Sequence, residues 1–227
     1  MDSVYTSYVF SIVVQLILLV VLAYNVDMPV SPELAVLREA FRFEYYVSII
    51  EFLGYLLIGY MLFQKKSVTI YRYADWFITT SILLISLSYV FLYRLYKEKD
   101  KTKELTNKYI FTEYRPVLQS LFLSNFFMLL FGFLGEMKKI PYFIGFILGM
   151  ICFIITFTTL SNNFVKENKA NDDLFTIFML IWLFYGFAYL MPYKSKNMFY
   201  NLLDLVSKNM FGLYILYIIQ QEKQTIN

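Results

Sequence analysis

Long runs of apolar residues, separated by short polar stretches, cover almost the entire chain. A helix needs about twenty mostly apolar residues to cross a bilayer, and seven runs have this length. They cover residues 5–24, 42–63, 70–94, 116–136, 141–160, 173–193 and 197–219. Pro116 and Pro141 suit first helical turns, where a missing N–H costs little. The pattern predicts an all-α membrane protein in which residues 1–227 form one domain, a bundle of seven transmembrane helices.

The connections between the spans predict the orientation of the chain. If the N-terminus lies outside, the inner connections and the tail hold twelve Lys and Arg residues, and the outer connections hold six. We therefore expect the N-terminus outside and the C-terminus in the cytoplasm. The charged segment 97–108 is then a solvated cytoplasmic connection, and Ser31-Pro32-Glu33 predicts a short helical turn in the first connection.

Composition narrows the class of protein further. Hydrophobic residues make up 59% of the chain, aromatic residues 21% and charged residues only 16%, a balance that excludes an ordinary soluble domain. The chain has no histidine and one cysteine, Cys152, so an internal disulfide is excluded and we expect no metal site. Neither an enzyme nor a nucleic-acid partner is indicated. We expect an integral, multi-pass protein of the lipid bilayer.

Polar and ionisable side chains inside the spans are functional candidates, because burying them in a bilayer is costly. They concentrate in the first, second, third and last spans, and spacings of three, four or seven place each set on one helix face. The sets are Ser7, Ser11 and Gln15; Glu44 and Glu51; Arg72, Asp75, Thr79 and Ser86; and Asn197, Asn201, Asp204 and Lys208, with Asn209 beside them. Four helices are thus predicted to enclose a polar interior.

Simpler explanations stay open for several of these residues. The serines of the first span are able to bond back to backbone carbonyls, and Glu44, near the end of its span, is able to reach water. A carboxyl as deep as Glu51 is either protonated or faces water or a cation. Lys208 is the costliest residue, and the carboxylate of Asp204, four residues earlier, is placed to hold its charge.

Three spans carry motifs that occur together in one known family. The motifs are Arg72-Tyr73-Ala74-Asp75-Trp76 with Thr79-Thr80; Trp182 with Tyr185 and Tyr189; and Asp204 with Lys208 and Phe211-Gly212. They resemble the third, sixth and seventh helices of the microbial (type 1) rhodopsins, in the order and at the spacing of that family. The resemblance covers the whole chain, and the combination is far more specific than a lone Asp-x-x-x-Lys.

The resemblance implies a covalently bound cofactor, all-trans retinal, as a Schiff base on Lys208. It implies that Asp75 and Asp204 are the counterions and that Arg72 keeps both of them ionised. The remaining residues of the implied retinal site are Trp76, Thr79, Thr80, Trp182, Tyr185 and Tyr189.

Departures from the family's proton pumps bear on function. The cytoplasmic carboxylic acid of the third helix is replaced by Ser86, and prolines of the third and sixth helices by Ser81 and Gly186. The release carboxylates before the last helix are replaced by the segment 194–197. An efficient outward proton pump is therefore disfavoured.

The similarity is closest to the viral rhodopsins of large algal viruses, in the group of light-gated cation channels. The shared residues are Ser11, Gln15, Glu44, Glu51, the pair Lys196-Asn197, Asn201 and Asn209. With Ser86, they are the implied pathway for monovalent cations and protons. Substitutions at Glu44 and Glu51 are then expected to alter conductance with little effect on visible absorption.

Other functions stay open at this point. A light-driven outward proton pump of low efficiency and a sensory rhodopsin both fit the same retinal-binding residues. Thr80 and the fourth span also lack the cysteine and the aspartate of other channelrhodopsins, which puts their gate in doubt here. Relatives associate as homo-oligomers, and no motif in the chain chooses a number of subunits.

Overall fold

The computed structural model describes residues 3–166 and 168–226, and within them seven helical segments are long and apolar enough to span a membrane. The first five spanning helices are α1 (Ser3–Asn25), α2 (Ala35–Phe63), α3 (Thr69–Glu98), α5 (Arg115–Glu136) and α6 (Tyr142–Leu160). Then come α7 (Lys169–Tyr189) and the last span, which consists of α8 (Tyr193–Asp204) and α9 (Met210–Ile226). The predicted all-α fold with seven spans is confirmed.

Several predicted spans differ from the structure at their ends: the third, expected over 70–94, ends at Glu98, and the last, expected over 197–219, begins at Tyr193 and ends at Ile226. The second span, expected from residue 42, begins at Ala35 and follows a 3₁₀ turn at Pro32–Leu34, where the sequence predicts a short helical turn. The sixth span, expected over 173–193, begins and ends four residues earlier, because Asn168 caps its first turn.

The charged connection between α3 and α5 is partly helical. A 3₁₀ turn at Thr102–Glu104 and the short helix α4 (Asn107–Glu113) lie where the sequence predicts only a solvated connection. Lys103 of this turn forms an ion pair with Glu33 at 2.8 Å. The connection is therefore attached to the segment that precedes α2.

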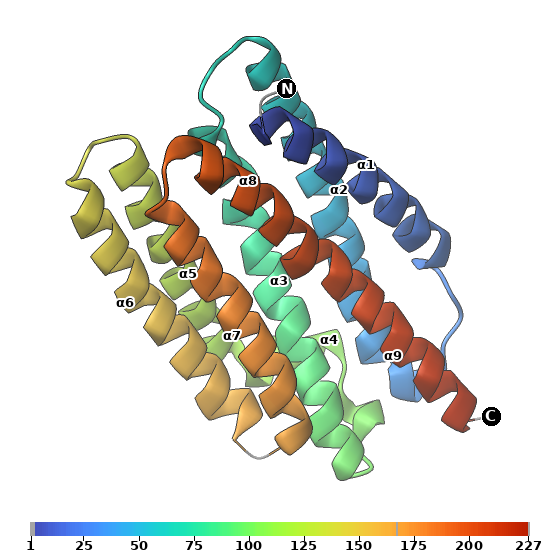
Figure 1. Cartoon of the computed structure of the whole chain (residues 1–227). Coiled ribbons are helices and arrows are strands. Elements are labelled where there is room, and N and C mark those ends of the chain that lie inside the picture. The colour runs from blue at the N-terminus through green and yellow to red at the C-terminus, as the bar shows by residue number, and fades with distance from the viewer. Residues whose placement is uncertain (1–2, 167, 227) are drawn as a thin grey trace.

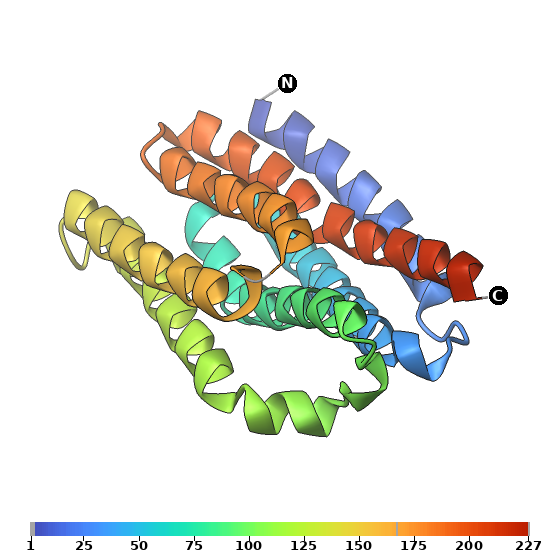
Figure 2. The ribbon, with the colours of Figure 1, turned by 90° about the horizontal axis from the view of Figure 1, so that it is seen from below.

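Helix α3 lies at the centre of the bundle. In its most apolar window 67% of the residues are buried, against 22% for α1 and for α5. Figures 1 and 2 show α2 and α5 on opposite sides of α3. Side chains on several faces of α3 are thus available to build a site.

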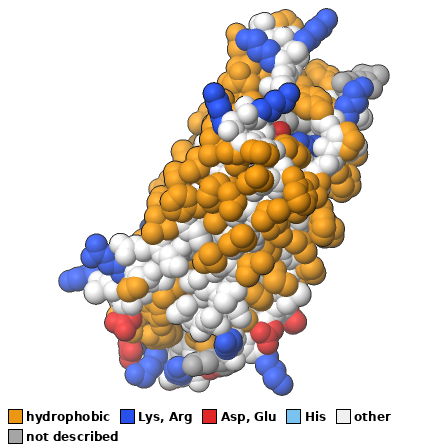
Figure 3. Space-filling model, turned by 90° about the vertical axis from the view of Figure 1, so that its left-hand side faces the viewer, with side chains coloured by type: hydrophobic (Ala, Val, Ile, Leu, Met, Phe, Trp, Pro, Cys, Tyr) orange, Lys and Arg blue, Asp and Glu red, His pale blue; other side chains and the backbone are white. Residues whose placement is uncertain are grey.

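The two termini lie at opposite ends of the bundle, which are called the N-terminal end and the C-terminal end below (Figure 1). On the face in Figure 3, hydrophobic side chains cover the middle of the bundle, and charged side chains gather towards its two ends. This distribution suits a bilayer, because apolar groups then face lipid and charged groups face water.

Helices α5 and α6 approach each other closely at a pair of glycines. A Cβ atom added at Gly145 would lie 2.8 Å from the carbonyl oxygen of Phe131 and 3.2 Å from the Cα of Gly135. These are backbone atoms, which move only if the two helices separate. Small residues allow this close packing between membrane helices.

Gly145→Ala is therefore expected to lower the free energy of unfolding by about 1–3 kcal/mol, the usual cost of overpacking. Gly149→Ala, one turn later on α6, is the matched control, because its added Cβ would make an ordinary contact at 3.4 Å. Thermal unfolding of the purified variants measures both. Equal melting temperatures for the two variants would contradict the close approach at Gly145.

Candidate functional site

An apolar cavity of about 110 Å³ lies among α3, α5, α6 and α7, with Lys208 in its wall. Its wall includes five of the predicted retinal-site residues: Trp76, Thr80, Trp182, Tyr185 and Tyr189. An apolar cavity of roughly 150 Å³ is able to bind benzene, whereas one water needs only about 10–15 Å³. The cavity is therefore of a size and polarity that suit an organic group.

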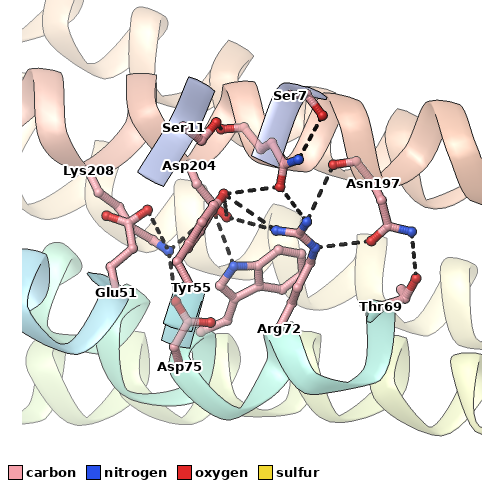
Figure 4. Close-up of polar contacts among 12 residues, drawn as sticks. Ser7, Ser11, Glu51, Tyr55, Thr69, Arg72, Asp75, Asn197, Asp204 and Lys208 are labelled. Atoms are coloured by element: carbon pink, nitrogen blue, oxygen red, sulfur yellow. Dashed lines mark hydrogen bonds and ion pairs between the residues drawn. The ribbon is translucent and has the colours of Figure 1, made fainter. Parts of the chain in front are cut away.

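The amine of Lys208 is buried among three carboxyl groups from three helices (Figure 4). Its Nζ lies 3.2 Å from Oδ1 of Asp204, 3.4 Å from Oδ2 of Asp75 and 3.7 Å from Oε1 of Glu51. Asp75 and Asp204 are the predicted counterions. Glu51, predicted only as part of an ion pathway, is a third carboxyl group beside the amine, at 3.7 Å.

A π-helical turn, Leu205–Asn209, carries Lys208. It joins α8 to α9 and directly follows Asp204. Such turns hold an extra residue and occur frequently at functional sites. The residue spacing in the sequence, which assumes an uninterrupted α-helix, does not predict this turn.

Four side chains besides Lys208 donate hydrogen bonds to the carboxylate of Asp204. Oδ2 accepts from the Tyr55 hydroxyl at 2.9 Å and from Arg72 Nη1 at 3.4 Å. Oδ1 accepts from the Trp76 indole at 3.1 Å and from the Tyr185 hydroxyl at 2.8 Å. Donors aimed at a carboxylate stabilise its ionised form, so Asp204 is held as an anion.

Asp75 has fewer donors than Asp204. Among the residues that the structure describes, only Lys208 donates a side-chain hydrogen bond to the Asp75 carboxylate. In the same set Arg72 forms an ion pair with Asp204 and none with Asp75. Arg72 therefore contacts one of the two predicted counterions directly.

Arg72 continues the polar network towards the N-terminal end. Its Nε donates to Oδ1 of Asn197 at 3.1 Å, and its Nη2 donates to Oδ1 of Asn201. Asn201 donates to Ser7 at 2.8 Å, and its backbone carbonyl accepts from Ser11 at 3.0 Å. Ser7 also bonds back to the carbonyl of Val4, and both serines link α1 to α8. Figure 4 shows Arg72 between the Asp204 side and the Asn197 side of this network.

The polar residues on the other side of Lys208 surround two glutamates. Glu51 accepts from Gln15 at 3.4 Å and from Asn209 at 2.7 Å. Glu44 is 0% exposed and accepts from Ser86. The alternative that Glu44 reaches water at a helix end is therefore not what the structure shows. All of these belong to the predicted pathway set.

Two residues lie outside the sites to which the sequence assigns them. Lys196, predicted in the ion pathway, points away from its neighbour Asn197 and pairs with Glu136 of α5 at 2.6 Å. Thr79, predicted in the retinal site, is buried and donates to the backbone carbonyl of Asp75 at 2.9 Å. The cavity wall, as far as the structure describes it, does not include Thr79.

Sequence reasoning missed other residues of the site. Tyr55 lies four residues after Glu51, and this spacing places both on one face of α2, a signal that was available. Asn125 of α5 donates to Thr80 at 2.9 Å and to Ser81 at 3.1 Å. The spacing of residues gives no signal for Asn125, because its partners lie on another helix.

These features define a membrane protein with a cavity that suits an organic group beside a buried amine. The sequence matches the family described as bacteriorhodopsin-like protein over residues 3–222, and the chain belongs to that family. It is an integral, multi-pass membrane protein whose family, the microbial rhodopsins, binds retinal covalently. A search of curated protein sequences finds no match.

Solved structures share this fold. The viral rhodopsin OLPVRII is 24% identical over 97% of this chain and 99% of that chain, with a TM-score of 0.82. A blue light-absorbing proteorhodopsin from Med12 is 22% identical over 98% of this chain and 100% of that chain, with a TM-score of 0.77. Bromide-bound halorhodopsin from Halobacterium salinarum is 12% identical over 99% and 96%, with a TM-score of 0.74. At these identities the likeness establishes the fold.

The residues present fit a covalently bound retinal. Of the residues that line the described cavity, Lys208 is the one that carries an amine. The cavity wall is mostly apolar and aromatic, which suits a polyene. Glycines widen it, since a Cβ at Gly186 would lie 3.1 Å from the sulfur of Met150. The carboxylates beside Lys208 would balance a positive charge on its nitrogen.

Arg72→Gln is expected to destabilise the protein by about 3–5 kcal/mol, because it breaks a buried ion pair and leaves Asp204 with Lys208 as its remaining cation among the described residues. Arg42→Gln is the control, since Arg42 pairs with Glu39 at the surface, at 2.9 Å and with a third of its side chain exposed. Removing such a surface pair costs less than about 1 kcal/mol. Thermal unfolding measures the difference, and similar melting temperatures would contradict the importance of the buried pair.

Proposed function

We propose that the protein is a light-gated channel for monovalent cations and protons, with all-trans retinal bound to Lys208 as a Schiff base. Asp75 and Asp204 are its counterions in this proposal. Residues 1–227 form one domain, with the N-terminus outside and the C-terminus in the cytoplasm. When bound, retinal supplies the absorption of visible light and a light-driven change of shape beside Lys208.

A row of buried oxygen atoms without a hydrogen-bond partner carries this proposal. Within the described residues the row consists of Oε1 of Gln15, Oε2 of Glu44, Oγ of Ser48 and Oδ1 of Asn209. Both amides donate to Glu51, and a carboxylate only accepts. Both amides therefore direct their NH2 groups towards Glu51 and their oxygens away from it. Oxygens that lack donors favour cations and water, and cation pores use such linings.

The row extends from the Lys208 cluster towards the C-terminal end. Glu44, Ser48 and Glu51 share one face of α2, and the seven-residue step from Glu44 to Glu51 is about 10 Å at helical rise. Asn209 lies three residues before Gly212, where an added Cβ would be 3.4 Å from the Cβ of Glu44. This placement supports a path past Glu51 to a constriction at Glu44.

Apolar side chains close the path beyond Glu44. Leu22 lies 3.2 Å from the Cβ position of Gly212, and Leu22, Leu37, Phe41 and Ile215 are all 0% exposed in one apolar cluster. Hydrophobic constrictions stop ions by excluding water. The arrangement supports a closed state, in which opening requires this apolar layer to separate.

The surroundings of the two counterions favour Asp75 as the group that accepts a proton from the Lys208 nitrogen. Four other donors hold Asp204 ionised, whereas Asp75 accepts from Lys208 alone among the described side chains. A proton on Asp75 therefore disturbs fewer hydrogen bonds. The transfer also removes the positive charge that Glu51 faces at 3.7 Å.

Glu51 is the residue that connects this charge change to the pathway. Without a cation beside it, the Glu51 carboxylate is held, among the residues that the structure describes, by the amides of Gln15 and Asn209. An unpaired buried carboxylate is costly, so Glu51 gains by drawing in a proton, water or a cation. Hydration at Glu51 would be the first step in opening the proposed path.

A slow outward proton pump is the second candidate, and one contact favours it. The carboxyl of Glu44 on α2 accepts a hydrogen bond from Ser86 on α3, the position where pumps of the family carry an acid. Glu44 is therefore placed to return a proton to the site from the C-terminal side. Recordings across a range of voltages separate a pump from a channel.

Illuminated cells that express the protein are expected to show a passive current that reverses sign with voltage. Replacing external sodium by a large organic cation should shift the reversal potential to more negative values. Lys208→Ala is expected to abolish both the current and the visible absorption band, because the amine is lost. A light-driven current of one sign at all voltages would support the pump and reject the channel.

Glu44→Gln and Glu51→Gln are expected to change the photocurrent in different ways. Both remove a carboxylate from the proposed path, so both should reduce cation current and alter selectivity. Glu51→Gln should also shift the absorption maximum, since Glu51 lies 3.7 Å from the Lys208 nitrogen; this revises the expectation from the sequence. Glu39→Gln, at the surface of the same helix, is the control. Unchanged currents in both pathway variants would exclude the proposed path.

A further inference from the structure

A second buried ion pair lies at the N-terminal end of the bundle, apart from the row of oxygens. Lys196 in the first turn of α8 pairs with Glu136 at the end of α5, at 2.6 Å. Their side chains are only 7% and 11% exposed. Taking two charges out of water is costly, so a buried ion pair is stable only where further hydrogen bonds and contacts hold its geometry.

Two stacked tyrosines support this pair. Lys196 donates to the hydroxyl of Tyr142 at 2.7 Å, and its Nζ lies 5.0 Å and 5.3 Å from the ring centres of Tyr142 and Tyr189. The two rings stack in parallel at 4.3 Å. A lysine over aromatic faces gains a further electrostatic attraction, so the amine contacts α5, α6 and α7 at once.

Tyr142 and Tyr189 also bond to each other's backbone. The Tyr142 hydroxyl donates to the carbonyl of Tyr189, and the Tyr189 hydroxyl donates to the carbonyl of Tyr142 at 3.2 Å. This reciprocal pair joins the start of α6 to the end of α7. The Lys196 amine, bonded to one of the two hydroxyls, therefore acts on both helices.

Tyr189 belongs to the wall of the retinal cavity, and glycines fix its position. A Cβ at Gly135 would lie 2.1 Å from the Tyr189 hydroxyl, and a Cβ at Gly145 would lie 3.2 Å from it. The ring is therefore seated in a space that only glycines leave open. A displacement of the Tyr189 hydroxyl would therefore also move the ring face that lines the cavity.

The first turn of α8 also contacts the polar network around Arg72. Asn197, next to Lys196, accepts from Arg72 at 3.1 Å and donates to Thr69 at 2.9 Å, and Figure 4 shows it turned towards both. Neighbouring residues of a helix point about 100° apart. One turn of α8 thus contacts the cavity wall through Lys196 and the Arg72 network through Asn197.

We infer that Lys196 is a positioning residue of the retinal cavity. Through Glu136 and the Tyr142 hydroxyl it fixes Tyr189 in the cavity wall, and it joins that wall to the Arg72 network through the first turn of α8. The inference rests on the cavity and on the family's retinal, and it holds for a channel and for a pump alike.

The absorption maximum of the retinal-loaded protein tests this inference. Lys196→Gln and Glu136→Gln should shift the maximum in the same direction, and the double variant should shift it no further, because both changes break one link. Lys196→Arg, which keeps charge and donors, should reduce the shift. Lys139→Gln, an exposed lysine at the same end, is the control and should leave the maximum unchanged.

Tyr142→Phe separates positioning from bundle stability. It keeps the stacked ring and the ion pair but removes the hydroxyl that links Lys196 to the Tyr189 carbonyl, so the maximum should still shift. Melting temperatures of the protein purified without retinal should fall most for Lys196→Gln and Glu136→Gln, which leave a buried charge unpaired. If these variants melt earlier while they and Tyr142→Phe keep the wild-type maximum, the pair only stabilises the bundle and the inference is overturned.

Discussion

The buried charge of Lys208 is the constraint on which the rest of the site depends. A charged amine is stable inside a membrane bundle only where anions and further hydrogen bonds compensate it. Three helices supply these anions through Glu51, Asp75 and Asp204. The compensation therefore also ties α2, α3 and α8 together at one point. Fold stability and site chemistry are determined by the same contacts.

The bundle is divided into two halves around this point. Helices α1, α2 and α8 contribute amides, serines and carboxyls, which form continuous hydrogen-bonded networks with Arg72 and Glu51. Helices α5, α6 and α7 contribute the aromatic and glycine-rich wall of the cavity. Helix α3 belongs to both halves, since Asp75 faces the amine and Trp76 faces the cavity. A change in the cavity therefore reaches the polar half through α3 and Lys208.

Most of the fold followed from the chain pattern, because seven long apolar runs leave little choice of architecture. The proximity of two carboxylates to Lys208 could be predicted too, since Asp204 lies one turn from Lys208 and Asp75 lies in a specific motif. Contacts between distant helices could not. The approach of Glu51 to Lys208 and of Glu136 to Lys196 depends on how the helices pack, and residue spacing along one helix carries no information about that.

Adjacent residues show the same limit of pattern reasoning. Lys196 and Asn197 were assigned to one pathway as a pair that the chain shares with the viral channels, yet they point to different helices. A helical wheel would have separated them, since neighbours differ by about 100° in direction. The partner of each would still have needed the three-dimensional arrangement.

The π-helical turn at Leu205–Asn209 determines the directions in which the side chains of α9 point. The turn takes up one additional residue, so the residues after it point about 100° away from where uninterrupted α-helical winding would place them. Ile215 and Leu216, which belong to the closed apolar cluster, thus owe their direction to a detail of backbone winding several residues upstream. Removing a single residue from that turn would restore ordinary α-helical winding and leave the second half of the last span facing the same neighbours. Removing a residue from the regular part of α9 has no such compensation and would turn the residues after it by about 100°.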